Sequence, residues 1–203
     1  MTTTLRAAGD LFSGASGTGH DTGWWAMACV CGTEAAFFAY LITAYAYLAT
    51  RATAWPPPGI ARPSLVIPVV MTVALVTSSL VMAAAERAIR AGNVRALAFR
   101  LSISMGLGLV FVGLLIAEYA GRLRELLPQT HVYGSLFYVM TGMHGLHVIA
   151  GLLLIGYTLL RTLRGDFRAG AFGGVSVVAL YWHFVDVVWL VLFTTLYLSP
   201  RFS

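Results

Sequence analysis

Five long apolar stretches, separated by short polar connectors, run along the chain. A helix needs about 20 mostly apolar residues to cross the hydrocarbon core of a bilayer, with a range of about 17–25. Backbone groups in lipid must be hydrogen-bonded within their own segment, which favours helices, and the alternating pattern of β-barrel strands is not seen. The pattern therefore predicts an all-α integral membrane bundle whose five transmembrane helices span residues 24–49, 65–85, 101–117, 132–160 and 175–198.

The connectors between these stretches are too short to hold a second folded domain. Residues 1–23 are rich in Gly, Ser and Thr, which predicts a flexible N-terminal tail. We expect residues 24–199 to form one five-helix transmembrane domain. The first apolar stretch is longer than the roughly 7–15 apolar residues of a secretory signal peptide, so we expect it to be a transmembrane helix.

Composition narrows the class of protein further. Hydrophobic residues make up 59% of the chain and charged residues 10%, whereas about 25% of the residues in soluble domains are charged. A soluble fold of this size has too little interior to bury that much apolar surface. This excludes an ordinary soluble enzyme, a disordered chain and a nucleic-acid-binding domain.

The positive charge is distributed in a way that predicts membrane topology. The net charge is +5, and all 13 basic residues are arginines. Eight of them lie in the N-terminal tail and in the second and fourth connectors, and five lie in the first and third connectors and at the C-terminus. Because cytoplasmic loops carry an excess of basic residues, this bias predicts that the N-terminus and its tail lie in the cytoplasm.

Several polar side chains occur inside the predicted helices, where a charge costs about 2.5–3.5 kcal/mol on insertion scales. We therefore expect them to face the interior of the bundle, in one layer near the middle of the membrane. His144 and His147 share one face of a helix at spacing i and i+3, as do His183 and Asp186. The candidate site consists of these four residues together with Glu34, Glu118 and Trp182.

Three interpretations of this polar layer are open. It can be a buried network of hydrogen bonds and ion pairs that fixes helix packing, a set of proton or lipid-headgroup contacts, or a ligand set for a metal or a haem. Glu34 can be a neutral, hydrogen-bonded acid or an acid that exchanges protons. Glu118 closes the third stretch near the interface, where its side chain can reach water. Trp182 lies with Asp186 and Trp189 in an aromatic stripe that is typical of packing.

Small residues spaced four apart form two rows on the third predicted helix. One row contains Gly113, Ala117 and Gly121, and the other contains Ser104 and Gly108. Because small side chains let helix backbones approach closely in membranes, both rows predict sites of helix packing.

Two longer motifs on the last two predicted helices are more specific. Residues 141–148 read TGMHGLHV and residues 181–189 read YWHFVDVVW, and together they closely resemble subunit III of the haem-copper terminal oxidases. The segment GSLFY at 134–138, Glu34 followed by Phe37-Phe38, the Trp55-Pro-Pro-Pro loop and Glu118-Tyr119 are similar to the same family. The resemblance extends from about residue 24 to residue 198.

The resemblance implies the five-helix bacterial form of a family whose longer members have seven spans. It implies a multi-pass protein of the bacterial inner membrane, and a non-catalytic subunit of a complex that reduces oxygen to water and pumps protons. Haem and copper would then lie in partner subunits, with no catalytic residue and no metal on this chain. The family's carbodiimide-reactive carboxylate corresponds to Glu34, its paired histidines to His144 and His147, and its last-helix His and Asp to His183 and Asp186.

The implied partners are subunit I in direct contact, subunit II and a small subunit IV in the same complex, and bound membrane phospholipid. The implied role is to support assembly of subunit I, proton uptake, and access of lipid and oxygen. Two alternatives are kept: a related subunit from a nitric oxide reductase cluster, and a stand-alone membrane cytochrome that binds haem through two histidines. A transporter is less favoured, because the polar residues gather in one layer instead of lining a path across the membrane.

Overall fold

The computed structural model describes residues 22–57, 60, 64–123, 131–165 and 173–201, and within them the chain forms five long helices and no strands. Each helix is long and apolar enough to cross a membrane, which confirms the predicted all-α class with five transmembrane helices. The helices are α2 (Thr22–Arg51), α3 (Val66–Arg90), α4 (Val94–Arg122), α5 (Val132–Leu163) and α6 (Gly173–Phe193), and α6 continues through a π-helical turn (Thr194–Leu198) and a 3-10 turn (Ser199–Arg201).

Some of the sequence-based expectations concern residues that the structure does not describe. Residues 1–21 of the expected tail lie outside the described residues, and residues 22–23 already belong to α2. Pro58 of the proline loop also lies outside them. Four of the arginines used to predict the topology are likewise not described, namely Arg6, Arg62, Arg124 and Arg168. The cytoplasmic location of the N-terminus therefore stays a prediction.

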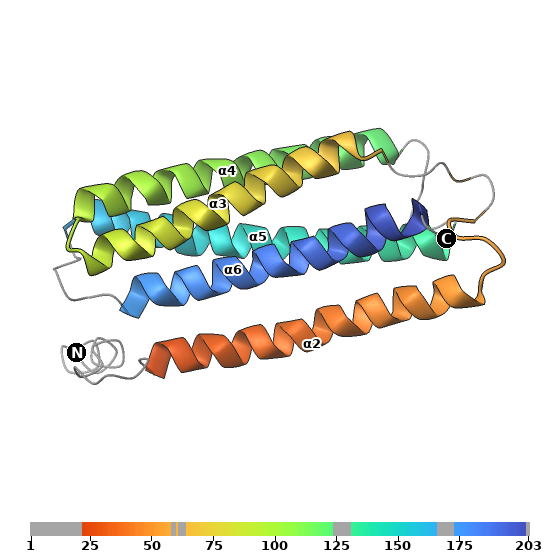
Figure 1. The fold of residues 1–203 in the computed structure, drawn as a ribbon, viewed down its shortest axis with the longest axis horizontal. Helices are drawn as coiled ribbons and strands as arrows, with labels where there is room; N and C mark the ends of the chain where they lie inside the picture. The colour runs from red at the N-terminus through yellow and green to blue at the C-terminus, as the bar shows by residue number, and fades with distance from the viewer. Residues whose placement is uncertain (1–21, 58–59, 61–63, 124–130, 166–172, 202–203) are drawn as a thin grey trace, which may run out of the picture.

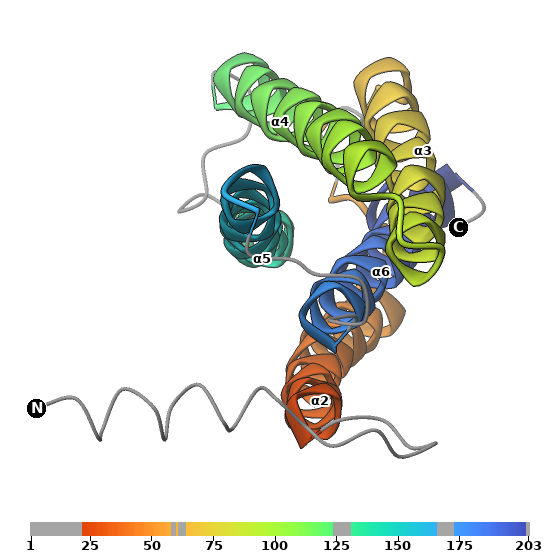
Figure 2. The same ribbon diagram turned by 90° about the vertical axis from the view of Figure 1, so that its left-hand side faces the viewer.

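Consecutive helices run in opposite directions along the long axis of the bundle (Figure 1). The first and last of the five, α2 and α6, run in the same direction and lie side by side. Helix α6 is at the centre, because it packs against α2, α3 and α5, whereas α4 packs against α3 and α5 (Figure 2). Helix α2 lies at the edge of the bundle and contacts mainly α6. Contacts between α2, α5 and α6 therefore decide how α2 is held.

The tight connection between α3 and α4 is made by Gly92 and Asn93. Gly92 adopts a φ of 72°, in the left-handed region that favours glycine, and its N–H donates to the carbonyl of Ile89 at 2.9 Å. The Asn93 N–H donates to the Ala88 carbonyl at 2.9 Å, which completes a Schellman closure of α3. The Asn93 side chain then accepts from the Ala96 N–H at 2.9 Å and caps the start of α4. One Gly-Asn pair thus ends one helix and starts the next.

Helix α4 extends beyond the predicted stretch of 101–117 at both ends. At its start, Arg100 donates from Nη1 to the Ala84 carbonyl of α3 at 2.5 Å. At its end, Glu118 forms an ion pair with Arg122 on the next turn. Hydropathy places helix ends at the first charged residues, but these charges have partners inside the bundle, so the helix continues through them.

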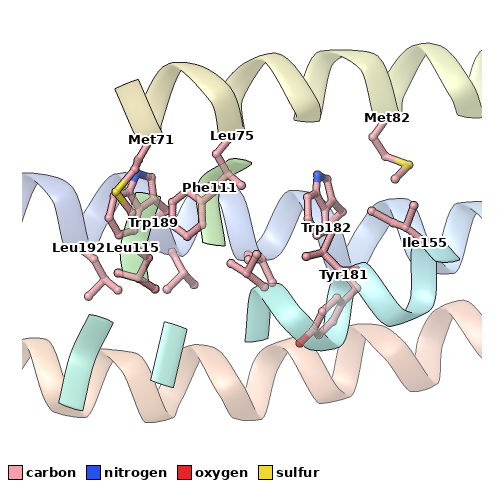
Figure 3. Packing of buried hydrophobic residues seen from close by; sticks show 14 of the residues in the cluster. Met71, Leu75, Met82, Phe111, Leu115, Ile155, Tyr181, Trp182, Trp189 and Leu192 are labelled. Atoms are coloured by element: carbon pink, nitrogen blue, oxygen red, sulfur yellow. The ribbon is translucent and has the colours of Figure 1, made fainter. Parts of the chain in front are cut away.

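The centre of the bundle is filled by large apolar and aromatic side chains from α3, α4, α5 and α6 (Figure 3). Trp182 and Trp189 are fully buried, as are Leu75 and Phe111. The outward faces are also apolar: Tyr40 is 73% exposed and Leu153 is 70% exposed. An apolar exterior around a packed centre is typical of a bundle whose helices associate by van der Waals packing in lipid.

Candidate functional site

Glu34 of α2 and His147 of α5 meet where α2 crosses the bundle. Glu34 Oε2 lies 2.9 Å from His147 Nε2, and His147 Nδ1 lies 2.7 Å from the Met143 carbonyl oxygen. A carbonyl can only accept, so Nδ1 carries a proton and donates it to Met143. Nε2 then either accepts from a protonated Glu34 or, as part of an imidazolium, donates to its carboxylate. In both forms one proton is held between Oε2 and Nε2.

The surroundings of this pair are aromatic on one side and open on the other. The Phe38 ring packs edge-on against the His147 ring with centroids 5.2 Å apart, and the Tyr181 hydroxyl of α6 donates to the His147 carbonyl at 3.2 Å. The Glu34 side chain keeps 34% of its exposure, whereas that of His147 keeps 14%. The carboxyl is therefore accessible from the outer face of the bundle, and the imidazole is covered.

His144 lies one turn earlier on α5 and has a different environment. It is fully buried among aromatic rings, with centroids 5.6 Å from Phe111, 5.2 Å from Trp189 and 6.4 Å from Phe38. Neither ring nitrogen forms a hydrogen bond with any residue that the structure describes. The structure thus separates the two histidines of the pair: His147 binds Glu34, and His144 is enclosed by apolar rings.

His183 and Asp186 share a face of α6, as expected from their spacing, but they do not bind each other. His183 Nδ1 lies 2.6 Å from Ser79 Oγ on α3. Asp186 is buried, with 5% of its surface exposed, and neither carboxyl oxygen forms a hydrogen bond with a described residue. Ser79 is near enough to act on the Asp186 charge, although the two side chains do not meet in hydrogen-bond geometry. The shared face predicted from the spacing is present, and the hydrogen bond that the structure describes there joins His183 to Ser79.

The two tryptophans of the α6 stripe are anchored to α3. Trp182 Nε1 donates to Ser78 Oγ at 2.7 Å, and Ser78 Oγ lies 3.1 Å from Ser104 Oγ of α4. Trp189 Nε1 donates to Thr72 Oγ1 at 2.9 Å. These bonds support the packing interpretation of the stripe and fix its rotational position against α3.

Glu118 does not extend into solvent as the sequence suggests. It is 5% exposed, and its Oε1 accepts from Arg122 Nε at 2.5 Å. The Arg122 guanidinium lies over the Phe137 ring at 4.9 Å from the centroid and over the Tyr197 ring at 5.8 Å. Because Arg122 compensates the carboxylate, Glu118 remains inside the bundle instead of snorkelling to the interface.

The described residues contain no cluster of three or more His, Cys, Asp or Glu side chains that could hold a metal ion. They also do not fit a haem held by two histidines. Both nitrogens of His147 are engaged, and His144 is fully buried among the rings of Phe111 and Trp189, so neither histidine is placed to join His183 as a second axial ligand.

A comparison with known protein families matches a part of the chain that contains all of these residues. The family model for cytochrome c oxidase subunit III matches residues 26–200. The chain belongs to the cytochrome c oxidase subunit III family. It is 39% identical over 171 residues to "Cytochrome c oxidase subunit 3" of Thermostichus vulcanus, which covers 84% of both chains. The protein of the same name from Synechocystis is 40% identical over 81% of this chain and 70% of its own length.

Relatives from animals in the subunit III family are longer. The pig protein named "Cytochrome c oxidase subunit 3" is 38% identical over 144 residues, which are 70% of this chain but only 54% of the pig protein. The match confirms the resemblance that was drawn from the motifs at 141–148 and 181–189.

Sequence reasoning missed several polar residues that hold this subunit III bundle together. Ser78 and Ser79 carry no hydropathy signal that separates them from serines facing lipid. On α3, Glu86 binds Arg90 at 2.7 Å and also accepts from the Ser176 hydroxyl of α6 at 2.7 Å. The i, i+4 spacing of Glu86 and Arg90 is a signal that could have indicated the first of these two contacts.

The two rows of small residues on α4 have different environments in this family member. Ser104 and Gly108 are buried, and a side chain at Gly108 would collide with Trp182. Gly113, Ala117 and Gly121 are exposed, and the two glycines have nothing of the chain within 4 Å of an added Cβ. The row of Ser104 and Gly108 therefore packs inside the bundle, whereas the row of Gly113, Ala117 and Gly121 faces its outside.

Proposed function

We propose that this chain is the non-catalytic subunit III of an aerobic haem-copper oxidase in a bacterial cell membrane. The observation that carries the proposal is the family match over residues 26–200, together with about 40% identity to two cyanobacterial proteins named cytochrome c oxidase subunit 3. Haem and copper lie in the partner subunits, and this chain supplies support. Neither a nitric oxide reductase subunit nor a stand-alone cytochrome finds support in the comparisons.

The partners follow from the same proposal. Subunit I contacts this chain directly, and subunit II and a small fourth subunit belong to the same complex. The apolar outer faces of the helices are suited to a neighbouring transmembrane subunit and to phospholipid, because both contact large exposed side chains such as Tyr40 and Leu153. The N-terminus lies on the cytoplasmic side, in agreement with the arginine bias.

The candidate residues serve mainly to hold the bundle in one arrangement. The Glu34–His147 contact joins the peripheral helix α2 to α5, where few other contacts exist. The Trp182 and Trp189 bonds join α6 to α3. Because Glu34 is accessible at the bundle surface and shares a proton with His147, the same contact can also exchange a proton or meet a lipid headgroup.

A test removes this chain from the complex and leaves the remaining subunits in place. We expect the haem spectrum of the membrane to be retained, because the redox centres lie elsewhere. Oxygen consumption should continue at a lower rate, because the redox centres remain while the support for assembly and proton uptake is lost. Loss of the haem spectrum from a complex whose other subunits are all present would show that this chain binds a redox centre and would overturn the support role.

A further inference from the structure

We propose that Asp186 is a proton-binding site of this chain, filled and emptied along the seam between α3 and α6 through Ser79 and His183. The site is separate from the Glu34–His147 contact and does not rest on the support role proposed above. It would give the chain a proton-exchange function of its own, with the proton, carried at one end by water, as the ligand.

The burial of Asp186 is the first observation behind this proposal. The carboxyl is 5% exposed and has no hydrogen-bond partner among the described residues. An isolated carboxylate in apolar surroundings is very costly, so a group of this kind takes up a proton and remains neutral unless a cation compensates it.

No compensating group is available from the helices that pack against α6. The acidic and histidine side chains of those helices within the described residues include Glu34 on α2, Glu86 on α3, and His144 and His147 on α5. None of them forms a hydrogen bond or ion pair with Asp186 in the described part of the chain. Asp186 is thus a carboxyl built to hold a proton.

A short relay leads away from this carboxyl. Ser79 Oγ lies 2.6 Å from His183 Nδ1, and Asp186 follows His183 by three residues on the same face of α6. When the Asp186 side chain rotates so that its O–H reaches Ser79 Oγ, the serine can accept that proton while it passes its own to Nδ1 of the imidazole. The O–H bond of Asp186 breaks as a new O–H bond forms on Ser79. The original O–H bond of Ser79 breaks as an N–H bond forms on His183 Nδ1. The products are a carboxylate and an imidazolium, and loading follows the same steps in reverse.

A second polar contact joins α3 and α6 nearer the Arg90 end of the bundle. Glu86 follows Ser79 by seven residues on α3, and Ser176 precedes His183 by seven residues on α6, so each interval covers two turns, or about 10 Å. The Ser176 hydroxyl donates to the Glu86 carboxyl at 2.7 Å. A carboxylate at this separation attracts the positive charge on His183 when the imidazolium forms, and we assign transfer of the Nε2 proton over the remaining distance to water.

The experiment uses the intact complex and attenuated-total-reflection infrared spectroscopy. The carbonyl stretch of a protonated carboxylic acid is followed while the buffer is changed from H2O to D2O. We expect a band that is absent in Asp186→Asn and that shifts on deuteration in the unmodified complex. In Ser79→Ala we expect the band to remain, at a displaced position, and its deuteration to slow by about tenfold or more, because one link of the relay is missing.

A matched control is Ser102→Ala, which removes a lipid-facing hydroxyl of α4 that binds only the Ala98 carbonyl. It should leave the Asp186 band and its exchange rate unchanged. If Asp186→Asn does not assemble, the displacement of the band in Ser79→Ala identifies it without that variant. A spectrum in which neither variant changes any carboxylic-acid band, or equal exchange rates in Ser79→Ala and the unmodified complex, would overturn the proposal. The haem content of each variant complex tests the proposed support role separately, and we expect haem to be retained in all variants.

Discussion

Gly151 offers the most quantitative test of how the bundle packs. A Cβ at Gly151 of α5 would lie 2.7 Å from Trp182 Cε3 and 2.8 Å from Cζ3, which is closer than real Cβ atoms approach other heavy atoms. The indole cannot move aside, because its opposite edge lies against Gly108, where an added Cβ would be 2.8 Å from Cη2. Its Nε1 is also bound to Ser78 at 2.7 Å. Gly151→Ala must therefore displace Trp182 from a site that is closed on three sides.

The size of the effect follows from two contributions. Overpacking of a well-filled core costs about 1–3 kcal/mol. Displacement of the indole also leaves its buried N–H and the Ser78 hydroxyl poorly bonded, and an unsatisfied buried group costs about 1–3 kcal/mol. We expect Gly151→Ala to lower the free energy of unfolding by about 2–4 kcal/mol, since the two contributions partly overlap.

The assay is thermal dissociation of this subunit from the purified complex in mild detergent, followed for three proteins side by side. Gly156→Ala is the matched control on the same helix, because its added Cβ meets only Met105 Sδ at 3.9 Å, an ordinary contact. We expect Gly156→Ala to match the unmodified protein and Gly151→Ala to dissociate at a clearly lower temperature. Equal behaviour of the two alanine variants would refute the packing of Trp182 between α4 and α5.

Three further variants test the polar contacts, each by retention of the subunit in the purified complex and by its dissociation temperature. Glu34→Ala strands the Nε2 atom of His147 and should cost about 1–3 kcal/mol, whereas Glu34→Gln keeps a hydrogen-bonding group in place and should cost less; equal losses would argue against the contact. Trp189→Phe removes the pyrrole ring together with its N–H donor to a threonine, so we expect a loss of about 2–4 kcal/mol from the cavity and the lost bond, and no loss would argue against this packing. Glu118→Gln leaves a largely buried arginine without its counter-charge and should cost about 3 kcal/mol. Glu86→Gln disrupts a partly exposed pair and should cost less than about 1 kcal/mol. A larger loss for Glu86→Gln than for Glu118→Gln would contradict the burial of the Glu118 pair.

The transmembrane helices could be predicted because lipid imposes a length and an apolar composition that few other structures share. The start and end of α4 could not be predicted in the same way. Arg100 and Glu118 mark the ends of the apolar stretch, but each finds a partner within the bundle. Arg100 binds a carbonyl of α3, which depends on the fold, whereas Glu118 binds Arg122 one turn later, a spacing that a hydropathy pattern does not record.

The candidate polar residues were predictable as a group, because each is costly inside a membrane unless it faces the interior. Their partners were less accessible to sequence reasoning. The spacing of His183 and Asp186 indicates one shared face but not that Ser79 from another helix lies beside both. Likewise, the spacing of His144 and His147 does not show that one binds a carboxyl and the other lies among rings, because the offset between α2 and α5 decides this.

The central claim, that this chain is the third subunit of a haem-copper oxidase, is tested most directly by copurification. A tag is placed at the C-terminus, native membranes are extracted in mild detergent, and the visible spectrum and the subunit composition of the product are recorded. The account predicts a coloured complex that contains haem and a larger multi-span subunit in stoichiometric amount. A colourless single polypeptide, or a single polypeptide that carries haem by itself, would contradict it.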